Sequence, residues 1–313
     1  MFEIKRYNQE YATEWNSFNA VSRQGTFLLD RNYMDYHSDR FHDHSLMFYL
    51  NGSLFAILPA NEDGDYFHSH QGLTYGGLIT NTAATAANII KLFEELNEYL
   101  RVNGFKHVIY KCIPWIYHRI PSEEDLYGIY RSCNAHLISR EISSTIDFTH
   151  ALKWRRDRKY GINKAINNNI KIEANSNDFN GFWKVLCDNL MISHHVNPVH
   201  SLTEMQLLKS RFPNNIILYV ARKDNEVIGG TVLYLTSNVV HSQYISANPE
   251  GKHLRVVDAI YNQILHQDFI SYHYFDFGKS TEDKGHFLNE SLIYQKEGFG
   301  GRGVIYDTYE WDL

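Results

Sequence analysis

One order of predicted elements occurs twice along this chain of 313 residues. In the first half, Asn51-Gly52 between two apolar runs predicts a hairpin. A strand at 66–70, a glycine-containing loop, a helix through 89–100 and a strand at 105–112 follow. In the second half, runs at 216–221 and 227–235 predict a hairpin, with Gly229-Gly230 as a bulge. A strand at 239–245, a loop, a helix through 256–265 and a strand at 272–278 follow.

Two short motifs support the idea of a repeat. His68-Ser69 and His241-Ser242 fall at the same place in the two halves. The repetition predicts an internal duplication of a β-rich α/β unit, and the length fits two domains. We therefore expect an α+β (α/β) protein with one domain at residues 1–150 and a second at 151–313, each a mixed, mostly antiparallel sheet flanked by helices.

Composition narrows the class of protein. The net charge of −6 argues against broad binding of nucleic acid, although a local basic patch remains compatible with it. The three cysteines are scattered, which predicts neither a disulfide framework nor a cysteine zinc site. The first residues lack the apolar core of a signal peptide, and the sequence has no apolar run of about 18 residues. We expect a soluble, cytoplasmic protein.

Chemistry is suggested by the segment that starts at Tyr274. It reads as a buried strand that ends in Asp276, Gly278 and Lys279, followed later by a glycine-rich turn that begins at Lys296. Charged groups at the end of a strand indicate a site. From the residues alone, Asp276 is a general base, an anchor for a substrate amine or a strand-end cap. Lys279 either holds an anionic group or is a solvated lysine.

A basic segment runs from Lys153 to Lys171, with seven Lys or Arg residues and one acid. Arg155, Arg158 and Lys159 lie within about one helical turn, so at least two of them can converge on one anion. Phosphate of a nucleotide-linked sugar, coenzyme A or tRNA is the ligand that suits such a cluster. A solvated helix face is the alternative.

The order of elements in each half resembles the unit of GNAT acyltransferases, and two units in tandem resemble the Fem-type aminoacyl transferases. Three motifs carry the second resemblance. Lys164-Ala165 and Ile170-Lys171-Ile172 match a family pattern, with Asn169 in place of a glycine, as expected for a residue that tolerates positive φ. The strand end at Gly278 and the Lys296-Glu-Gly-Phe-Gly-Gly301 turn are the other two, although Gln295 replaces the family's phenylalanine.

This resemblance implies an N-acyltransferase whose active site lies in the second half. Lys296 would stabilise the negative charge that develops on the acyl oxygen, while Asp276 and Lys279 orient the reactants. The implied reaction moves an acyl group, such as acetyl, onto an amine of a cell-envelope precursor or a nucleotide-linked amino sugar. An aminoacyl-tRNA-dependent transferase and a catalytically silent scaffold that binds a ligand are the alternatives.

The donor stays open at this stage. GNAT enzymes hold the pyrophosphate of acetyl-CoA with a glycine-rich turn, and the matching positions keep only part of it, in Gly251, Lys252 and His253. Acetyl-CoA or another acyl-CoA is therefore a candidate cofactor with a degenerate motif. We see no inserted helical hairpin for tRNA, which favours a small-molecule donor.

Further candidates come from polar residues near glycines. Tyr244 on a predicted central strand faces either substrate or the core. His70 and Tyr75 are candidates for substrate contact. His68 and His70 share one strand face, but they lack an evident third ligand, so we predict no metal. His194-His195 is better explained by a loop or helix end than by a metal site.

Overall fold

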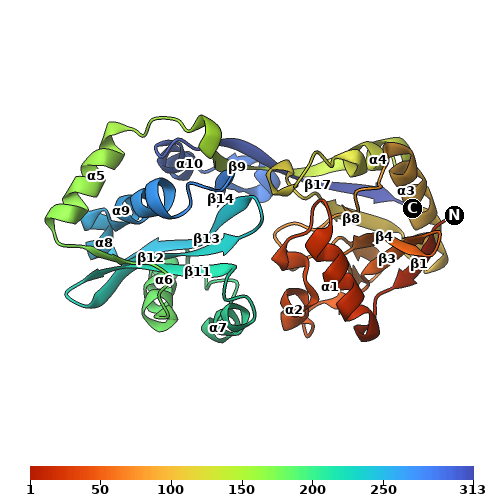
Figure 1. Ribbon diagram of the computed structural model, residues 1–313, viewed down its shortest axis with the longest axis horizontal. Coiled ribbons are helices and arrows are strands. Elements are labelled where there is room, and N and C mark those ends of the chain that lie inside the picture. Colours follow the sequence, from red (N-terminus) through yellow and green to blue (C-terminus); the bar gives the residue numbers. More distant parts are fainter. The chain divides into compact units, whose positions relative to one another are not determined.

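The computed structural model describes the backbone of residues 1–313 and all side chains except those of Ser193 and His194. The chain divides into two compact units (Figure 1). Unit 1 contains Met1–Ile142, Thr281–Phe287 and Ile305–Leu313, and unit 2 contains Ser143–Ser280 and Leu288–Val304. The predicted division was a single cut after residue 150. The observed units are each discontinuous, because the segment Thr281–Phe287 and most of the last strand belong to unit 1.

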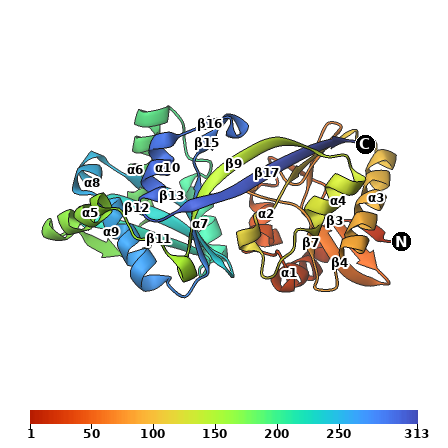
Figure 2. The same ribbon diagram turned by 90° about the horizontal axis from the view of Figure 1, so that it is seen from above.

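Unit 1 holds two groups of paired strands. The first has the order β1-β3-β4-β7, and its turn at Asn51 and Gly52 has positive φ at both residues, as the hairpin prediction requires. The second has the order β17-β8-β6-β5-β2, and β9 lies beside β17 (Figure 2). The strands are β1 (Glu3–Arg6), β2 (His42–Asp43), β3 (Leu46–Leu50), β4 (Ser53–Leu58), β5 (Asn61–Asp63), β6 (Tyr66–His68), β7 (Ile79–Thr80), β8 (His107–Lys111), β9 (His136–Asp147) and β17 (Arg302–Asp312).

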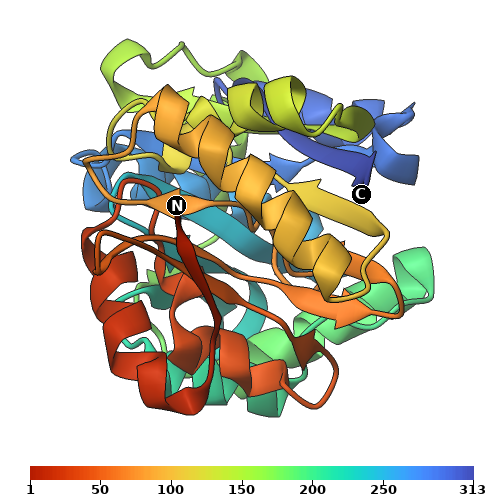
Figure 3. The same ribbon diagram turned by 90° about the vertical axis from the view of Figure 1, so that its right-hand side faces the viewer.

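The core of unit 1 forms where a long helix crosses these strands (Figure 3). Apolar residues at helical spacing, including Ile89, Phe93 and Leu96, are fully buried against the sheet. Thr85 caps the start of this helix and Gly104, at φ +86°, follows its end. The helices are α1 (Ala12–Val21), α2 (Arg31–Met34), α3 (Ala86–Val102) and α4 (Glu124–Ser132).

Unit 2 contains one mixed sheet in the order β10-β11-β12-β13-β14-β9. Asp224 and Asn225, both at positive φ, form the predicted turn between β11 and β12. Phe275 and Phe277 of β14 are buried on one face, against Tyr261. The strands are β10 (Lys171–Glu173), β11 (Ile216–Lys223), β12 (Glu226–Leu235), β13 (Val239–Ala247) and β14 (Tyr274–Lys279). The short β15 (Thr281–Glu282) belongs to unit 1, and the short β16 (Phe287–Leu288) lies at the end of the same segment.

Helices cover both faces of this sheet. In Figure 1, α5, α8 and α9 lie on one face, and α6 and α7 lie on the other. α6 ends at His194 and His195 adopts a left-handed conformation, which agrees with a helix end at this point, while the His194 side chain lies outside the described residues. The helices are α5 (Arg156–Asn167), α6 (Phe179–His194), α7 (Leu202–Arg211), α8 (Pro249–Leu254), α9 (Val256–Gln263) and α10 (Glu290–Glu297).

The bulge between β11 and β12 is displaced from its predicted place. Ala221 pairs with Gly229 and Arg222 pairs with Val227, so Ile228 is the extra residue. The glycines serve packing instead, because a Cβ on Gly230 would lie 2.7 Å from the ring of Phe182 in α6. The other conformational prediction is confirmed, since Asn169 has φ +56° after α5.

Strand register reveals the duplication directly. In unit 1, β6 and β8 run parallel over three residue pairs, and the last pair joins His68 to Ile109. In unit 2, β13 and β14 also run parallel over three pairs, and the last joins His241 to Asp276. The two histidines matched in the sequence thus occupy equivalent places, and only the second one faces an acid.

Candidate active site in unit 2

The central strands of unit 2 separate beyond His241 and Asp276. In the described chain, the parallel pairing of β13 with β14 ends at this pair. β13 continues beside β12 with a bulge, where Val232 pairs with Tyr244 and Leu233 with Ser242. β14 turns away through Gly278, which has φ +78°. The two central strands thus diverge at His241 and Asp276.

Asp276 lies at this point of separation and its side chain is fully buried. Its Oδ1 atom accepts hydrogen bonds from Ser143 Oγ, from Thr145 Oγ1 at 3.2 Å and from the Gly278 amide at 3.1 Å. Its Oδ2 atom lies 2.9 Å from His241 Nδ1. The bond to the amide two residues onward is the predicted strand-end cap, and the other contacts make this carboxylate a hub between β9, β13 and β14.

Lys296, in the last turn of α10, holds the end of β14. Its Nζ donates to the carbonyls of Gly278 and Lys279, both at 2.7 Å, and to Ser280 Oγ at 2.9 Å. Its side chain is only 8% exposed, and burial lowers its pKa to about 8 against the opposing effect of the Asp276 charge. All three N–H donors of the Lys296 ammonium group thus bind the end of β14. The Lys279 side chain, in contrast, is exposed.

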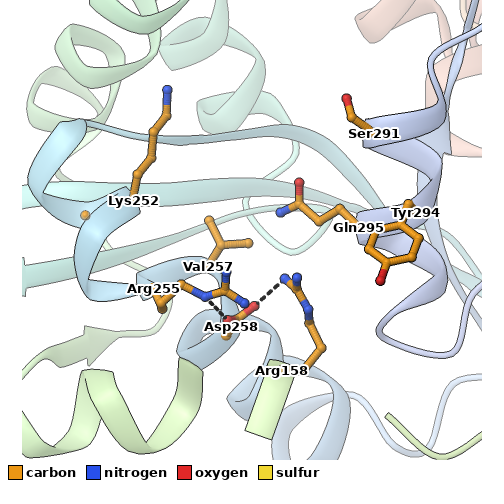
Figure 4. A pocket seen from close by; sticks show the side chains of 9 residues that line it. Arg158, Lys252, Arg255, Val257, Asp258, Ser291, Tyr294 and Gln295 are labelled. Atoms are coloured by element: carbon orange, nitrogen blue, oxygen red, sulfur yellow. Dashed lines mark hydrogen bonds and ion pairs between the residues drawn. The ribbon is translucent and has the colours of Figure 1, made fainter. Parts of the chain in front are cut away.

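A pocket of about 290 Å³ lies between α8, α9 and α10 (Figure 4). Three cationic side chains and one carboxylate are among its lining groups, so its walls are positively charged on balance. Arg158 and Arg255 both point at Asp258, while α10 supplies the opposite wall (Figure 4). The pocket is lined by Arg158, Gly251, Lys252, Arg255, Val257, Asp258, Ser291, Tyr294 and Gln295.

Two arginines share the buried carboxylate of Asp258. Arg158 Nη1 lies 2.8 Å from Oδ1, and Arg255 Nε lies 2.7 Å from Oδ2. Burial raises the pKa of Asp258, and the two guanidinium charges oppose that shift. Gly161 permits the arrangement, because a Cβ at this position of α5 would lie 1.8 Å from Asp258 Oδ2. Asp157 Oδ2 forms a further ion pair with Arg158, 2.7 Å from Nη2.

Arg155 lies next to the pocket rather than in its lining. Its guanidinium stacks on the ring of Tyr294, 3.5 Å from the centroid, and its amide donates to the Gly298 carbonyl. Its Nη2 atom is buried and has no hydrogen-bond partner among the described residues. A buried guanidinium nitrogen without an acceptor is unusual and is suited to an anionic ligand.

The structure brings together some of the predicted binding residues and not others. Arg158, Gly251 and Lys252 line one pocket, as a shared anion site requires, whereas Lys159 and His253 are exposed and do not line it. Arg255 was not predicted. It reaches the pocket because it adopts a left-handed conformation between α8 and α9, and as an arginine it is not a residue that indicates such a conformation.

A second pocket of about 300 Å³ lies between α6 and α8. Half of its lining residues are apolar and provide most of its exposed wall, and Lys252 lines both this pocket and the cationic one. Its lining consists of Val185, Asp188, Asn189, Met191, Ile192, Asn248, Pro249 and Lys252.

Tyr244 lies on the α6 face of the sheet, together with His241. Its hydroxyl is 2.7 Å from His200 Nδ1, and its ring meets the edge of Trp183. From the sequence, Tyr244 was expected to face either a substrate cleft or the core. The structure shows a half-buried tyrosine held by polar and aromatic neighbours, and its contact with substrate stays a prediction.

His70 and Tyr75 belong to unit 1 and are both buried. Burial lowers the pKa of His70 well below its usual value, and its ring contacts that of His37. Tyr75 donates a hydrogen bond to Thr26 Oγ1 at 3.1 Å. Their contact with substrate stays a prediction. Among the described residues, no group of three or more His, Cys, Asp or Glu side chains is arranged to hold a metal ion.

Comparison with known proteins defines the fold. No family model and no curated protein sequence matches the chain. Solved structures do match: FemX with a TM-score of 0.68 and 8% identity, over 99% of this chain and 97% of that one. L-PGS from Bacillus licheniformis matches with a TM-score of 0.61 and 10% identity, over 97% of this chain and 92% of that one.

A tandem GNAT protein from the clavulanic acid biosynthesis pathway matches with a TM-score of 0.55 and 10% identity, over 100% of this chain and 98% of that one. The chain therefore has the fold of Fem-type and tandem GNAT proteins, as its motifs indicated. Within the part of the chain described by the structure, no helix is both long enough and apolar enough to cross a membrane.

Proposed function

We propose that this protein is an N-acyltransferase that takes an acyl or aminoacyl group from a phosphate-bearing donor. The observation that carries the proposal is the cationic pocket formed by Arg158, Arg255 and Lys252. α10 connects this pocket to the point where the sheet opens. Its Gln295 lines the pocket, and the next residue, Lys296, binds the end of β14.

Phosphate suits the pocket for two physical reasons. Guanidinium groups bind phosphate oxygens through charge-assisted hydrogen bonds, and Arg158 and Arg255 are held in place by Asp258. The pocket also lies at the N-terminal end of α9, where the helix dipole favours an anion. A phosphate bound there leaves the rest of the donor to extend along the sheet toward the separated strands.

Lys296 contributes to the reaction through its charge in this proposal. Its three donors already bind the end of β14, so it keeps Gly278 in position and places a positive charge close to the opening. Acyl transfer develops negative charge on the carbonyl oxygen, and a nearby buried cation stabilises it. Asp276 and Lys279 orient the reactants.

The acceptor class follows from the family resemblance. We propose an amine on a cell-envelope precursor or a nucleotide-linked amino sugar, with acyl-CoA or aminoacyl-tRNA as the donor. Each of these is an intracellular metabolite, so the protein would act in the cytoplasm. His70 and Tyr75 stay candidates for substrate contact within this proposal.

Binding measurements with two donors test the proposal. Acetyl-CoA and aminoacyl-tRNA are titrated against the full-length wild type and against Arg255→Gln and Lys252→Gln. We expect at least one donor to bind and both variants to weaken binding by tenfold or more. Lys159→Gln is the matched control, because Lys159 lies on α5 outside the pocket. This variant should bind each donor with the affinity of the wild type.

Salt dependence separates the donors. Binding of tRNA through many phosphates falls steeply with ionic strength, whereas a donor with few phosphates shows a shallow slope. If neither donor binds, or if pocket and control variants bind alike, the phosphate-donor assignment is wrong and a catalytically silent scaffold becomes the better account.

A further inference from the structure

We propose that His241 is the general base that deprotonates the attacking amine, and that Asp276 positions its ring. This inference rests on the proposed acyl transfer and names the group that carries out its proton transfer. The two residues are opposite each other on adjacent parallel strands, at the last pair before these strands separate. His241 is thus placed at the opening of the sheet.

The carboxylate of Asp276 is arranged to orient the histidine and not to take the proton itself. Its Oδ1 atom already accepts bonds from Ser143, Thr145 and the Gly278 amide. These three donors already occupy the acceptor directions of that oxygen, so it is poorly placed to take a proton from a substrate. Its Oδ2 atom is left to hold His241 Nδ1 at 2.9 Å.

This contact fixes the tautomer of the ring. With the Nδ1 proton donated to Asp276, the lone pair of the neutral imidazole is on Nε2. The His241 side chain is 12% exposed. A Cβ on Gly278 would lie 3.4 Å from Cε1 and 4.0 Å from Nε2 of the ring. Gly278 therefore places no side chain of its own against that part of the ring.

The duplicated histidine provides an internal comparison. His68 has the same place in unit 1, at the last of three parallel pairs, but Ile109 faces it there. Only the copy in unit 2 has an acid as its cross-strand partner. The difference assigns the base to unit 2.

The proton balance of the step is complete. The neutral amine attacks the acyl carbon, an amide C–N bond forms, and the bond from the acyl carbon to the oxygen or sulfur of the donor breaks. His241 Nε2 takes the proton that the nitrogen loses. The imidazolium then gives this proton to the departing oxygen or sulfur, which regenerates the neutral ring.

Other titratable groups share this environment in unit 2. Tyr234 pairs with His241 across β12, and Tyr244 with its neighbour His200 lies on the same face. The charge of Asp276 also acts on the pKa of Lys296 on α10. A pH profile alone therefore does not identify the base, and the test needs variants of His241 itself.

The variants separate proton transfer from folding. His241→Asn keeps an amide near the position of Nδ1 and has no counterpart of Nε2, so the bond to Asp276 can persist. His241→Gln places its amide near Nε2 instead, and Asp276→Asn removes the orienting charge. His68→Asn is the matched control in unit 1. Circular dichroism and the unfolding midpoint establish that each variant is folded.

Two readouts are made on the full-length protein. The first is amide formation from acetyl-CoA or aminoacyl-tRNA and glycinamide as a function of pH. We expect His241→Asn to reduce the rate at neutral pH about 100-fold and to remove its rise with pH, since general bases contribute on the order of 10² to 10⁴. Asp276→Asn should also slow the reaction and displace the pH profile, while His68→Asn matches the wild type.

The second readout is independent of acyl transfer to an amine. Diethyl pyrocarbonate modifies neutral imidazole nitrogen, and peptide mass spectrometry gives a rate for each histidine. We expect His241 to react at least fivefold faster than His68, and Asp276→Asn to abolish this difference.

The outcomes distinguish the two levels of the account. If the wild type forms no amide but His241 reacts faster than His68 in an Asp276-dependent way, the pairing of His241 with Asp276 is supported and the proposed function is wrong. If the wild type and His241→Asn form amide equally fast, the base assignment is overturned while the proposed function stands. Equal modification of His241 and His68 also overturns the assignment.

Discussion

Lys296 shows how one buried charge joins structure to a proposed role. An ammonium group in a protein interior needs acceptors, and two carbonyls and a hydroxyl at the end of β14 provide them. The same contacts fix Gly278, which lies against the ring of His241. Loss of this lysine should therefore affect stability and, through the strand end, activity.

Replacement of Lys296 by Met should destabilise the protein by about 2 to 4 kcal/mol, because it leaves buried carbonyls without a donor. The pH dependence should change as well. The pKa of Lys296 is lowered to about 8 in the folded protein, so between this pH and its unfolded pKa the unfolded chain binds more protons. The free energy of unfolding of the wild type then rises by up to about 1.4 kcal/mol per pH unit.

Urea unfolding at pH 7 and pH 9.5 measures this effect. The difference in unfolding free energy between wild type and Lys296→Met should grow with pH. Lys279→Met, at an exposed side chain nearby, is the control and should follow the wild type. An equal pH slope in Lys296→Met and wild type would show that the buried ammonium does not titrate in this range.

At the level of single residues, the sequence identified some partners and missed others. Motifs placed Asp276 at a strand end and Lys296 at a glycine-rich turn, and the structure brings both to the end of β14. His241 was noted only as one half of a repeated dipeptide, since its relation to Asp276 depends on strand register. Arg255 was missed because its conformation has no sequence marker.

Among the elements, the contact of α5 with α9 decides whether the cationic pocket exists. Arg158 and Gly161 are three positions apart on α5 and so lie on one face of it. The first binds Asp258 and the second lets that carboxylate approach. The basic residues of α5 thus divide between a buried pocket wall and a solvated face, two readings that the sequence treated as alternatives.

Gly161→Ala tests this packing. Its methyl group would overlap Asp258 Oδ2, at 1.8 Å, so α5 and α9 must move apart at a cost of about 2 kcal/mol or more. We expect a lower unfolding midpoint and weaker donor binding. Asn163→Ala, at an exposed position of the same helix, should leave both measurements unchanged or slightly raise stability. Retained stability and binding in Gly161→Ala would contradict the described packing.

The order of elements was predictable because hairpins and helices leave local signals. The Asn51-Gly52 turn and the α3 periodicity specify their structures within a few residues. The bulge at Ile228 and the kink at Arg255 were not predictable, since each results from packing of one element on another. The elements that define the fold were thus visible in the sequence, and the irregularities that build the site were not.

For the whole molecule, the duplicated unit explains both the fold and its asymmetry. Each unit contains a pair of parallel strands that ends at a histidine, yet only unit 2 combines this histidine with an acid. The described cationic pocket also belongs to unit 2. The discontinuous units could not be inferred from the repeat, because only long-range pairing returns the last strand to unit 1.

Product formation tests the central claim most directly. The wild type is incubated with acetyl-CoA or aminoacyl-tRNA and with UDP-linked sugars and muramyl peptides that carry a free amine, and mass spectrometry detects new amides. We predict an amide that gains the mass of the donor's acyl group, formed at least tenfold more slowly by Arg255→Gln and unaffected by Lys159→Gln. Absence of any amide from these donors and acceptors, with folded wild-type protein, would contradict the assignment as an acyltransferase.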